Sequence, residues 1–173
     1  RSALQYNTAE NNTAVGYLAL QQNTTGTKNT AVGANALDAN TTASGNLAVG
    51  TDALGANTTG GGNSAVGKDA LKANTTASNN TAFGFECMIA NTTGTQNVAV
   101  GAQSLTTVTT ASNNTGVGYQ ALSLNTTGTK NAALGHQALY ANTTGGNLTA
   151  VGKGALVSNT TASNNTACGF EAL

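Results

Sequence analysis

Residues 12–28 read NTAVGYLALQQNTTGTK, and residues 29–45 repeat this pattern as NTAVGANALDANTTASG. The unit N-T-A-V-G-x-x-A-L-x-x-N-T-T-G/A-S/T-x recurs every 17 residues without an insertion. Units begin at residues 12, 29, 46, 63, 80, 97, 114, 131, 148 and 165, and residues 1–11 form a partial unit. Because self-similarity at a short fixed period indicates a repeat architecture, residues 1–173 are interpreted as a single array.

Positions within the unit are numbered from 1, at Asn12, to 17, and residues that share a position form a column. Column 5 is always glycine, which indicates positive φ or a close approach of two backbones at a turn. The predicted turn glycines of the first six units are Gly16, Gly33, Gly50, Gly67, Gly84 and Gly101. Columns 4 and 9 are bulky and apolar, and they predict the structural core. Its members in the same units are Val15, Val32, Val49, Val66, Phe83 and Val100, with Leu20, Leu37, Leu54, Leu71, Met88 and Leu105.

The unit favours strands over helices. Thr, Asn, Gly and Val are poor helix formers, and the breaks at columns 5 and 12–15 leave two segments of about five residues, which is strand length. We therefore predict an all-β fold, a parallel β-solenoid or β-roll of ten 17-residue coils. Each coil would contain a strand, a glycine turn, a second strand and a polar Asn/Thr turn. Stacked about 4.8 Å apart, ten coils would form a rod roughly 48 Å long.

Composition excludes several classes of protein. Lys+Arg and Asp+Glu number 6 each, so the formal net charge is +0 and the chain carries no electrostatic footprint for nucleic acid or an anionic membrane. No apolar run is long enough to span a bilayer. One histidine and two cysteines, without catalytic or metal-ligand spacing, predict neither an enzyme nor a cofactor site. Cys87 and Cys168 occupy apolar columns and are expected to be buried.

Alternating strand residues point to opposite faces, so the Val of T-A-V-G faces one way and the Ala the other. A strand that is apolar on both faces is usually covered on both. We expect the Val face to pack within its own coil and the small Ala face to admit another chain. The sequence therefore predicts a homo-oligomer, most simply a homotrimer about the rod axis.

The string N-T-A-V-G-Y-x-A-L-x-x-N-T-T-G-T-K-N resembles the repeats of phage and bacterial tail-fibre-type proteins. It is also similar to the N-S-x-A-I-G repeats in the heads of trimeric autotransporter adhesins. The resemblance covers essentially the whole chain, although the unit is longer than that of the adhesin heads. It implies a trimer of left-handed parallel β-rolls with the apolar strand inward, belonging to a longer fibre.

Column 6 contains the candidate glycan contacts, Tyr17, Phe85, Tyr119 and Phe170, together with the sole histidine, His136.

Column 7 contains a stack of three acidic residues, Asp52, Asp69 and Glu86, for which solvated charge is the first interpretation and a Ca²⁺ site the alternative. The N-T-T tripeptides are formal glycosylation acceptors, but the turn itself requires Asn and Thr. Column 15 alternates between Gly and Ala, with one break at Gly145, and this 34-residue super-period is interpreted as duplication of a pair of units.

The sequence thus predicts a structural and adhesive fibre segment without catalysis, extracellular, on a virion tail or a bacterial cell surface. It would give reach and host attachment, with itself and a cell-surface glycan or receptor as partners, no nucleic acid and no membrane insertion. The alternative is a glycan- or ice-binding module that uses the regular face of the solenoid. Against ice binding, adjacent Thr residues on a strand point apart, whereas a flat hydroxyl array requires them at i and i+2.

Overall fold

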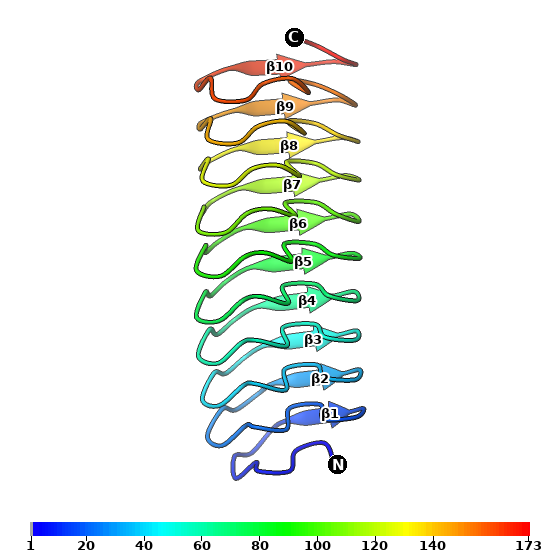
Figure 1. The fold of residues 1–173 in the computed structure, drawn as a ribbon, viewed down its shortest axis with the longest axis vertical. Coiled ribbons are helices and arrows are strands. Elements are labelled where there is room, and N and C mark those ends of the chain that lie inside the picture. Colours follow the sequence, from blue (N-terminus) through cyan, green and yellow to red (C-terminus); the bar gives the residue numbers. More distant parts are fainter. Residues whose placement is uncertain (1) are drawn as a thin grey trace.

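The computed structural model describes residues 2–173 as a parallel β-solenoid of ten stacked strands, drawn in Figure 1. The strands are β1 (Thr13–Val15), β2 (Thr30–Val32), β3 (Leu47–Val49), β4 (Ser64–Val66), β5 (Thr81–Phe83), β6 (Val98–Val100), β7 (Thr115–Val117), β8 (Ala132–Leu134), β9 (Thr149–Val151) and β10 (Thr166–Cys168). Each strand pairs in parallel with its neighbours in sequence, in order β1 to β10. Thr13 lies opposite Thr30, and the same shift of 17 residues holds at every pair, so each repeat forms one coil.

The column 5 glycines turn the chain out of each strand, at the right-hand edge of Figure 1. Gly84 has φ 140°, and a Cβ placed on it would lie 2.8 Å from the carbonyl carbon and oxygen of Gly101 in the next coil. Both the backbone conformation and the close stacking of successive corners therefore exclude a side chain. We name this side of the rod the glycine corner.

The predicted second strand is absent from every coil among residues 2–173, which is a correction to the sequence-based expectation. Two successive β-turns replace it, closed in the first coil by Ala19 N donating to Gly16 O (3.4 Å) and Gln21 N donating to Leu18 O (3.2 Å). Leu18 and Leu20 have φ 57° and 52°, the positive values that type II turns require at their third residue. This turn segment runs back across the front of the strands in Figure 1.

Leucine in the left-handed region is unusual, and its burial explains it. A non-glycine residue there costs about 1–2 kcal/mol. Leu20 is fully buried, and burying a leucine side chain contributes about 1.5–3 kcal/mol. Its backbone N–H also donates to Ala36 O of the next coil at 2.9 Å. A glycine would relieve the backbone cost but would leave the core empty, so leucine or methionine occupies column 9 in every coil.

The core lies between the strands and the turn segments and consists of columns 3, 8 and 9. Its leucine column is Leu20, Leu37, Leu54, Leu71, Met88, Leu105, Leu122, Leu139 and Leu156. The two strand faces are the reverse of the prediction. Alanines of column 3, such as Ala31 and Ala48, are fully buried, whereas column 4 lies on the outer face of the sheet. Val15, Val32, Val49, Val66, Phe83 and Val100 are therefore not core residues within the single chain.

The physical reason for this reversal is space. The leucine of column 9 fills the narrow interior, so the strand face opposite it has room only for a methyl group. Gly116 in column 3 illustrates how tight the fit is, because a Cβ there would lie 2.7 Å from Ser104 Oγ. Ser104 stands where most units carry alanine, and its Oγ donates to Gly116 O at 2.9 Å. At this level of the rod, the larger Ser104 in column 8 is accommodated by the smaller Gly116 in column 3.

Two buried asparagine ladders run along the polar turns. In column 12, Asn40 Nδ2 donates to Asn23 Oδ1 of the previous coil at 2.7 Å and to Ala43 O at 3.1 Å. In column 1, Asn29 Nδ2 donates to the same Ala43 O at 2.8 Å, and Asn46 N donates to Asn29 Oδ1 at 3.0 Å. Buried amides require such partners. In coils with asparagine in both columns, the column 15 carbonyl thus joins the two ladders, which fixes the shape of the polar turn.

The 34-residue super-period has a structural counterpart. A Cβ on Gly26 would collide with Ala43 O of the next coil, so this coil requires glycine in column 15. The following coil carries Ala43-Ser44, and Thr27 N donates to Ser44 Oγ at 3.0 Å. The same bond to a serine recurs from Gly61, Thr95 and Gly146. A glycine coil and the alanine-serine coil after it therefore form a bonded pair.

Candidate functional surfaces

The candidate functional features of this rod are surfaces. Over residues 2–173 the chain encloses no pocket, and these residues hold no group of three His, Cys, Asp or Glu side chains that could bind a metal ion. In the described part of the chain, no helix has both the length and the hydrophobicity that a membrane span requires. Three columns combine exposure with a recurring chemistry and are described in turn.

The first surface is the valine stripe, defined as column 4. It runs along the outer face of the ten-stranded sheet as Val15, Val32, Val49, Val66, Phe83, Val100, Val117, Leu134, Val151 and Cys168. Val15 is 60% exposed, Leu134 52% and Phe83 40%. The other outward column of the sheet, column 2, contains only Thr, Ser, Val, Leu and Ala. No charged side chain therefore interrupts the outer face of the sheet from β1 to β10.

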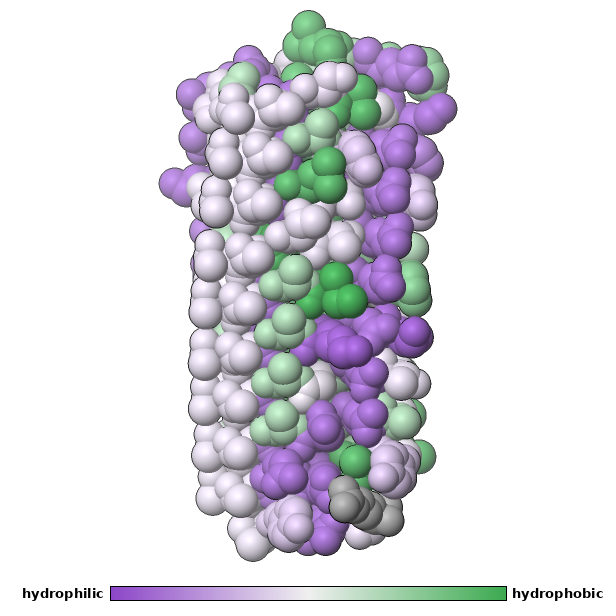
Figure 2. Space-filling model, in the orientation of Figure 1, coloured by the Kyte–Doolittle hydropathy of each residue, from purple (hydrophilic) through white to green (hydrophobic). Residues whose placement is uncertain are grey.

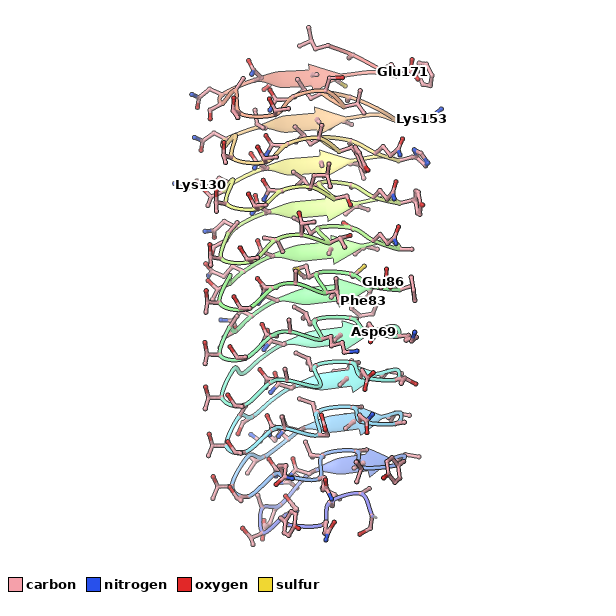
Figure 3. All side chains as sticks on the ribbon, viewed as in Figure 1. Asp69, Phe83, Glu86, Lys130, Lys153 and Glu171 are labelled. Carbon is pink, nitrogen blue, oxygen red and sulfur yellow. The ribbon has the colours of Figure 1, made fainter. Side chains whose placement is uncertain are left out.

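The second surface is the corner ridge, defined as column 6 at the glycine corner. All four predicted glycan contacts lie there and are exposed: Tyr17, Phe85, Tyr119 and Phe170. The sequence places them at least two coils apart, and in the structure three of them have a column 6 neighbour beside the ring, one of these being Lys68 Nζ at 5.7 Å from the centre of the Phe85 ring. The rings of Tyr119 and His136 lie 5.3 Å apart, and Lys153 Nζ lies 5.1 Å from the ring of Phe170. Figure 3 places Lys153 and Glu171 at this edge and Lys130 at the opposite one.

Column 7 lies beside the ridge and is bridged by hydrogen bonds from coil to coil. Lys72 Nζ donates to Asp69 Oδ1 (2.9 Å) and to Asp52 Oδ2 (3.2 Å). The Lys72 hydrogen bond holds the pKa of Asp69 below its usual range, although burial opposes it. Glu86 instead accepts from Gln103 Nε2 at 3.0 Å. The acidic side chains named as the alternative Ca²⁺ site therefore have lysine and amide partners, and Asp69 is buried beside its two lysines rather than solvated.

The third surface is the threonine column, defined as column 14 on the polar turns. It is Thr25, Thr42, Thr59, Thr76, Thr93, Thr110, Thr127, Thr144 and Thr161, and every member is exposed. Its hydroxyls make no hydrogen bond within residues 2–173. The adjacent column 13 differs, because Thr41 Oγ1 donates to Thr58 O of the next coil at 3.2 Å. In Figure 2 the edge of the polar turns shows pale, weakly polar columns along the rod.

The asparagines of the N-T-T tripeptides are structural. Asn40, Asn57 and Asn74 are fully buried, and the Nδ2 of each donates within the column 12 ladder. The folded rod therefore presents no free amide of these residues for glycosylation.

The two cysteines differ from each other. Cys87 is buried, its Sγ donates to Gly101 O at 2.6 Å, and burial raises its pKa to about 11. Cys168 is exposed at the end of the valine stripe, so the expectation that both would be buried is wrong for this residue.

Comparison with protein-family models, with curated proteins and with solved structures finds no match to this chain. The function must therefore be argued from the surfaces themselves.

Proposed function

We propose that this chain is a structural and adhesive segment of an extracellular fibre, a phage tail fibre or a bacterial surface adhesin, that acts as a homotrimer without catalysis. Its role is to hold a binding surface at a distance from the particle or cell that carries it. The stacked coils suit this role, because each coil bonds to the next through backbone and asparagine side chains along the whole rod. The resemblance to tail-fibre and adhesin repeats points the same way.

The observation that carries the proposal is the valine stripe. Exposed columns of this repeat generally vary in polarity: column 6 contains Ala, Thr, Lys, His and aromatic residues. Column 4 is also outward-facing, yet it is apolar in all ten coils. Packing within the single chain does not require that uniformity. Continuous apolar stripes on a protein surface mark interaction sites, and a second copy of the chain is the occupant that the uncharged sheet face fits best.

The size of this face is consistent with self-association. Ten strands at about 4.8 Å spacing, each three residues of about 3.3 Å, give a sheet of roughly 48 by 10 Å. Two such faces together bury about 1,000 Å², which is the lower bound for a specific interface. The uniform register of β1 to β10 also allows the stripe of one chain to follow that of another over its whole length. The trimer number comes from the resemblance alone.

The test is the oligomeric state measured by light scattering after size exclusion. The parent chain is expected to be a trimer at micromolar concentration. Val66→Lys, in the middle of the stripe, is expected to give a monomer with an unchanged circular dichroism spectrum, because a charge on this face cannot be desolvated without a partner. Thr76→Lys in the threonine column is the matched control and should remain a trimer. A parent chain that is monomeric at tens of micromolar overturns the proposal.

The threonine column supports a second candidate function, the binding of ice. Column 14 is exposed and uniform, and its hydroxyls are free of partners within the described chain. Column 16, two residues further along the chain, is Thr or Ser in most units, and its serine hydroxyls accept hydrogen bonds from backbone N–H groups of the preceding coil. The candidate ice-binding hydroxyls are therefore those of column 14.

Ice affinity purification tests this candidate. Ice binding predicts that the parent chain is retained in the ice fraction. Thr93→Tyr, at the centre of the threonine column, should lose this retention, and Val66→Lys should keep it. Parent protein that stays in the liquid fraction excludes it and leaves the fibre proposal untouched.

A further inference from the structure

We infer that the corner ridge binds an extended, uncharged, β-linked polysaccharide that lies parallel to the rod axis. The inference rests on the attachment role proposed above and names its ligand class. Its first support is the distribution of aromatic residues. The chain has only 4 Tyr and 3 Phe. Tyr17, Phe85, Tyr119 and Phe170, four of these seven, share one of the 17 columns, and the single histidine is also there.

Internal packing does not produce this concentration. Phe170 is 67% exposed, Tyr119 45% and Phe85 44%, so none of these rings belongs to the core. Ala34 and Ala102 occupy the same column in other coils, which shows that the glycine corner forms without an aromatic side chain. The rings are instead accessible from solvent, and an exposed aromatic ring offers an apolar surface on which the C–H side of a pyranose ring packs.

The spacing of the rings suits a linear chain of sugars. Phe85, Tyr119, His136 and Phe170 lie 34, 17 and 34 residues apart, that is two, one and two coils. The coil spacing of about 4.8 Å is close to the length of one sugar in an extended β-linked chain. Rings along the ridge therefore fall in register with successive or alternate sugars over about 24 Å.

Hydrogen-bonding groups lie along the same edge. Gln120 Nε2 donates to Gln103 Oε1 (3.1 Å) and Gln137 Nε2 donates to Gln120 Oε1 (3.0 Å), so the amides form a ladder beside the rings. Each amide has two N–H donors and two acceptor lone pairs, and the ladder uses one of each. The remaining donor and acceptor are available to sugar hydroxyls. The ladder fixes the amides in advance, which reduces the entropy lost on binding.

The charge pattern selects an uncharged ligand. Between Gln103 and Gln137 the ridge and column 7 contain Ala102, Tyr119, His136 and three amides, with no carboxylate or lysine. Two lysines of the ridge lie outside this section, Lys68 over the Phe85 ring and Lys153 over the Phe170 ring. Column 7 supplies a carboxylate for each of them, Asp69 in the same coil and Glu171 in the next. An acidic polysaccharide would find no net positive potential here, and an α-linked helical chain would not lie straight along the ridge.

The experiment is isothermal titration calorimetry of the full chain with a β-1,4-linked hexose hexamer, cellohexaose, alongside maltohexaose and an oligogalacturonate. The parent is expected to bind cellohexaose, and Tyr119→Ala to weaken it about tenfold. Tyr140→Ala, outside the ridge in column 10, is the matched control and should bind like the parent. Gln120→Ala should weaken binding less than Tyr119→Ala does. Circular dichroism checks that every variant keeps the fold, which the alanines already present in column 6 lead us to expect.

Absence of cellohexaose binding at millimolar concentration overturns the inference, as does a Tyr119→Ala variant that binds like the parent. Binding of the oligogalacturonate alone overturns the choice of an uncharged ligand, and equal binding of maltohexaose overturns the extended geometry. Light scattering measures assembly independently of sugar binding. A trimer that does not bind cellohexaose therefore overturns this inference alone, whereas a monomer overturns the fibre proposal.

Discussion

Columns 4 and 9 are alike in the sequence and opposite in the structure. Both are apolar in all ten units, and both predict a core. Leu20, Leu37 and their equivalents in column 9 are enclosed by the chain, whereas Val15 and the stripe that follows it lie on the outer face of the sheet. Uniformity within a repeat can therefore have two causes. Column 9 is uniform because the interior requires its volume. For column 4, we propose that contact with a second copy of the chain is the cause.

The largest expected effect is at the glycine corner. Gly84→Val places a branched side chain at φ 140° and against the Gly101 carbonyl. Backbone strain of this kind and forced overpacking together cost about 2–6 kcal/mol. Chemical denaturation should show this loss, or the variant should fail to fold. Phe85→Ala, the next residue, is expected to stay within about 0.5 kcal/mol of the parent because its ring is exposed. Equal loss in the two variants would contradict the column assignment.

The next effect separates columns 9 and 4 directly. Leu71→Ala removes a fully buried side chain and should destabilise each chain by about 2–5 kcal/mol. Val66→Ala, at the half-buried stripe, should cost under about 1 kcal/mol in dilute protein, where chains are separate. Urea melts at two protein concentrations provide the measurement. The cost of Val66→Ala should rise with concentration as chains associate, and a cost independent of concentration would argue against a covered stripe.

A smaller effect, of opposite sign, is expected in the asparagine ladder. Val108 occupies column 12, where the other full units have asparagine, and the buried Asn91 Oδ1 lacks a hydrogen-bond partner within residues 2–173. Val108→Asn should supply a donor to Asn91 Oδ1 and another to Ala111 O, and should accept from Asn125. After loss of the buried valine, a net stabilisation of about 1 kcal/mol is expected. A lower melting temperature in this variant would show that the gap has a packing role.

The smallest expected effect is that of pH and salt. Asp69 has a lowered pKa, so its contribution to stability is present above its unfolded value of 3.8 and is lost as pH falls through the folded value. Lys72 has a raised pKa, so its contribution is present below 10.5 and is lost as pH rises through the folded value. Burial raises the pKa of Asp38, which makes folding slightly less favourable once this carboxyl ionises.

The Asp69 transition lies below pH 3.8 and the Lys72 transition above pH 10.5, so the melting temperature should change little between about pH 5 and 9, and between low salt and about 1 M. Lys72→Ala removes the bridge to Asp52 and Asp69, and its cost should stay within about 1 kcal/mol because Lys72 is half exposed and Lys68 Nζ still lies 3.3 Å from Asp69 Oδ2. A steep pH or salt dependence of the parent would show that ion pairs, rather than ladders and buried columns, hold the rod together.

The sequence by itself determined the coil. A 17-residue period without insertions, glycine in every column 5 and leucine or methionine in column 9 were enough to predict a parallel β-solenoid, because these features act within one coil or between identical neighbours. The aromatic column was also visible in the sequence, and counting His136 and Lys153 with it would have indicated large side chains in four successive coils, from Tyr119 to Phe170. Asparagine in columns 1 and 12 pointed to ladders of the kind that the structure contains.

Only the tertiary structure decided which strand face is inside and what replaces the second strand. Alternation places Val and Ala on opposite faces but does not say which face the chain encloses. That depends on the space left by Leu20 and its equivalents, whose positive φ angles direct them inward from a pair of turns. The super-period required the structure for the same reason. The collision of a Cβ on Gly26 with Ala43 O, and the bond from Thr27 N to Ser44 Oγ, exist only between stacked coils.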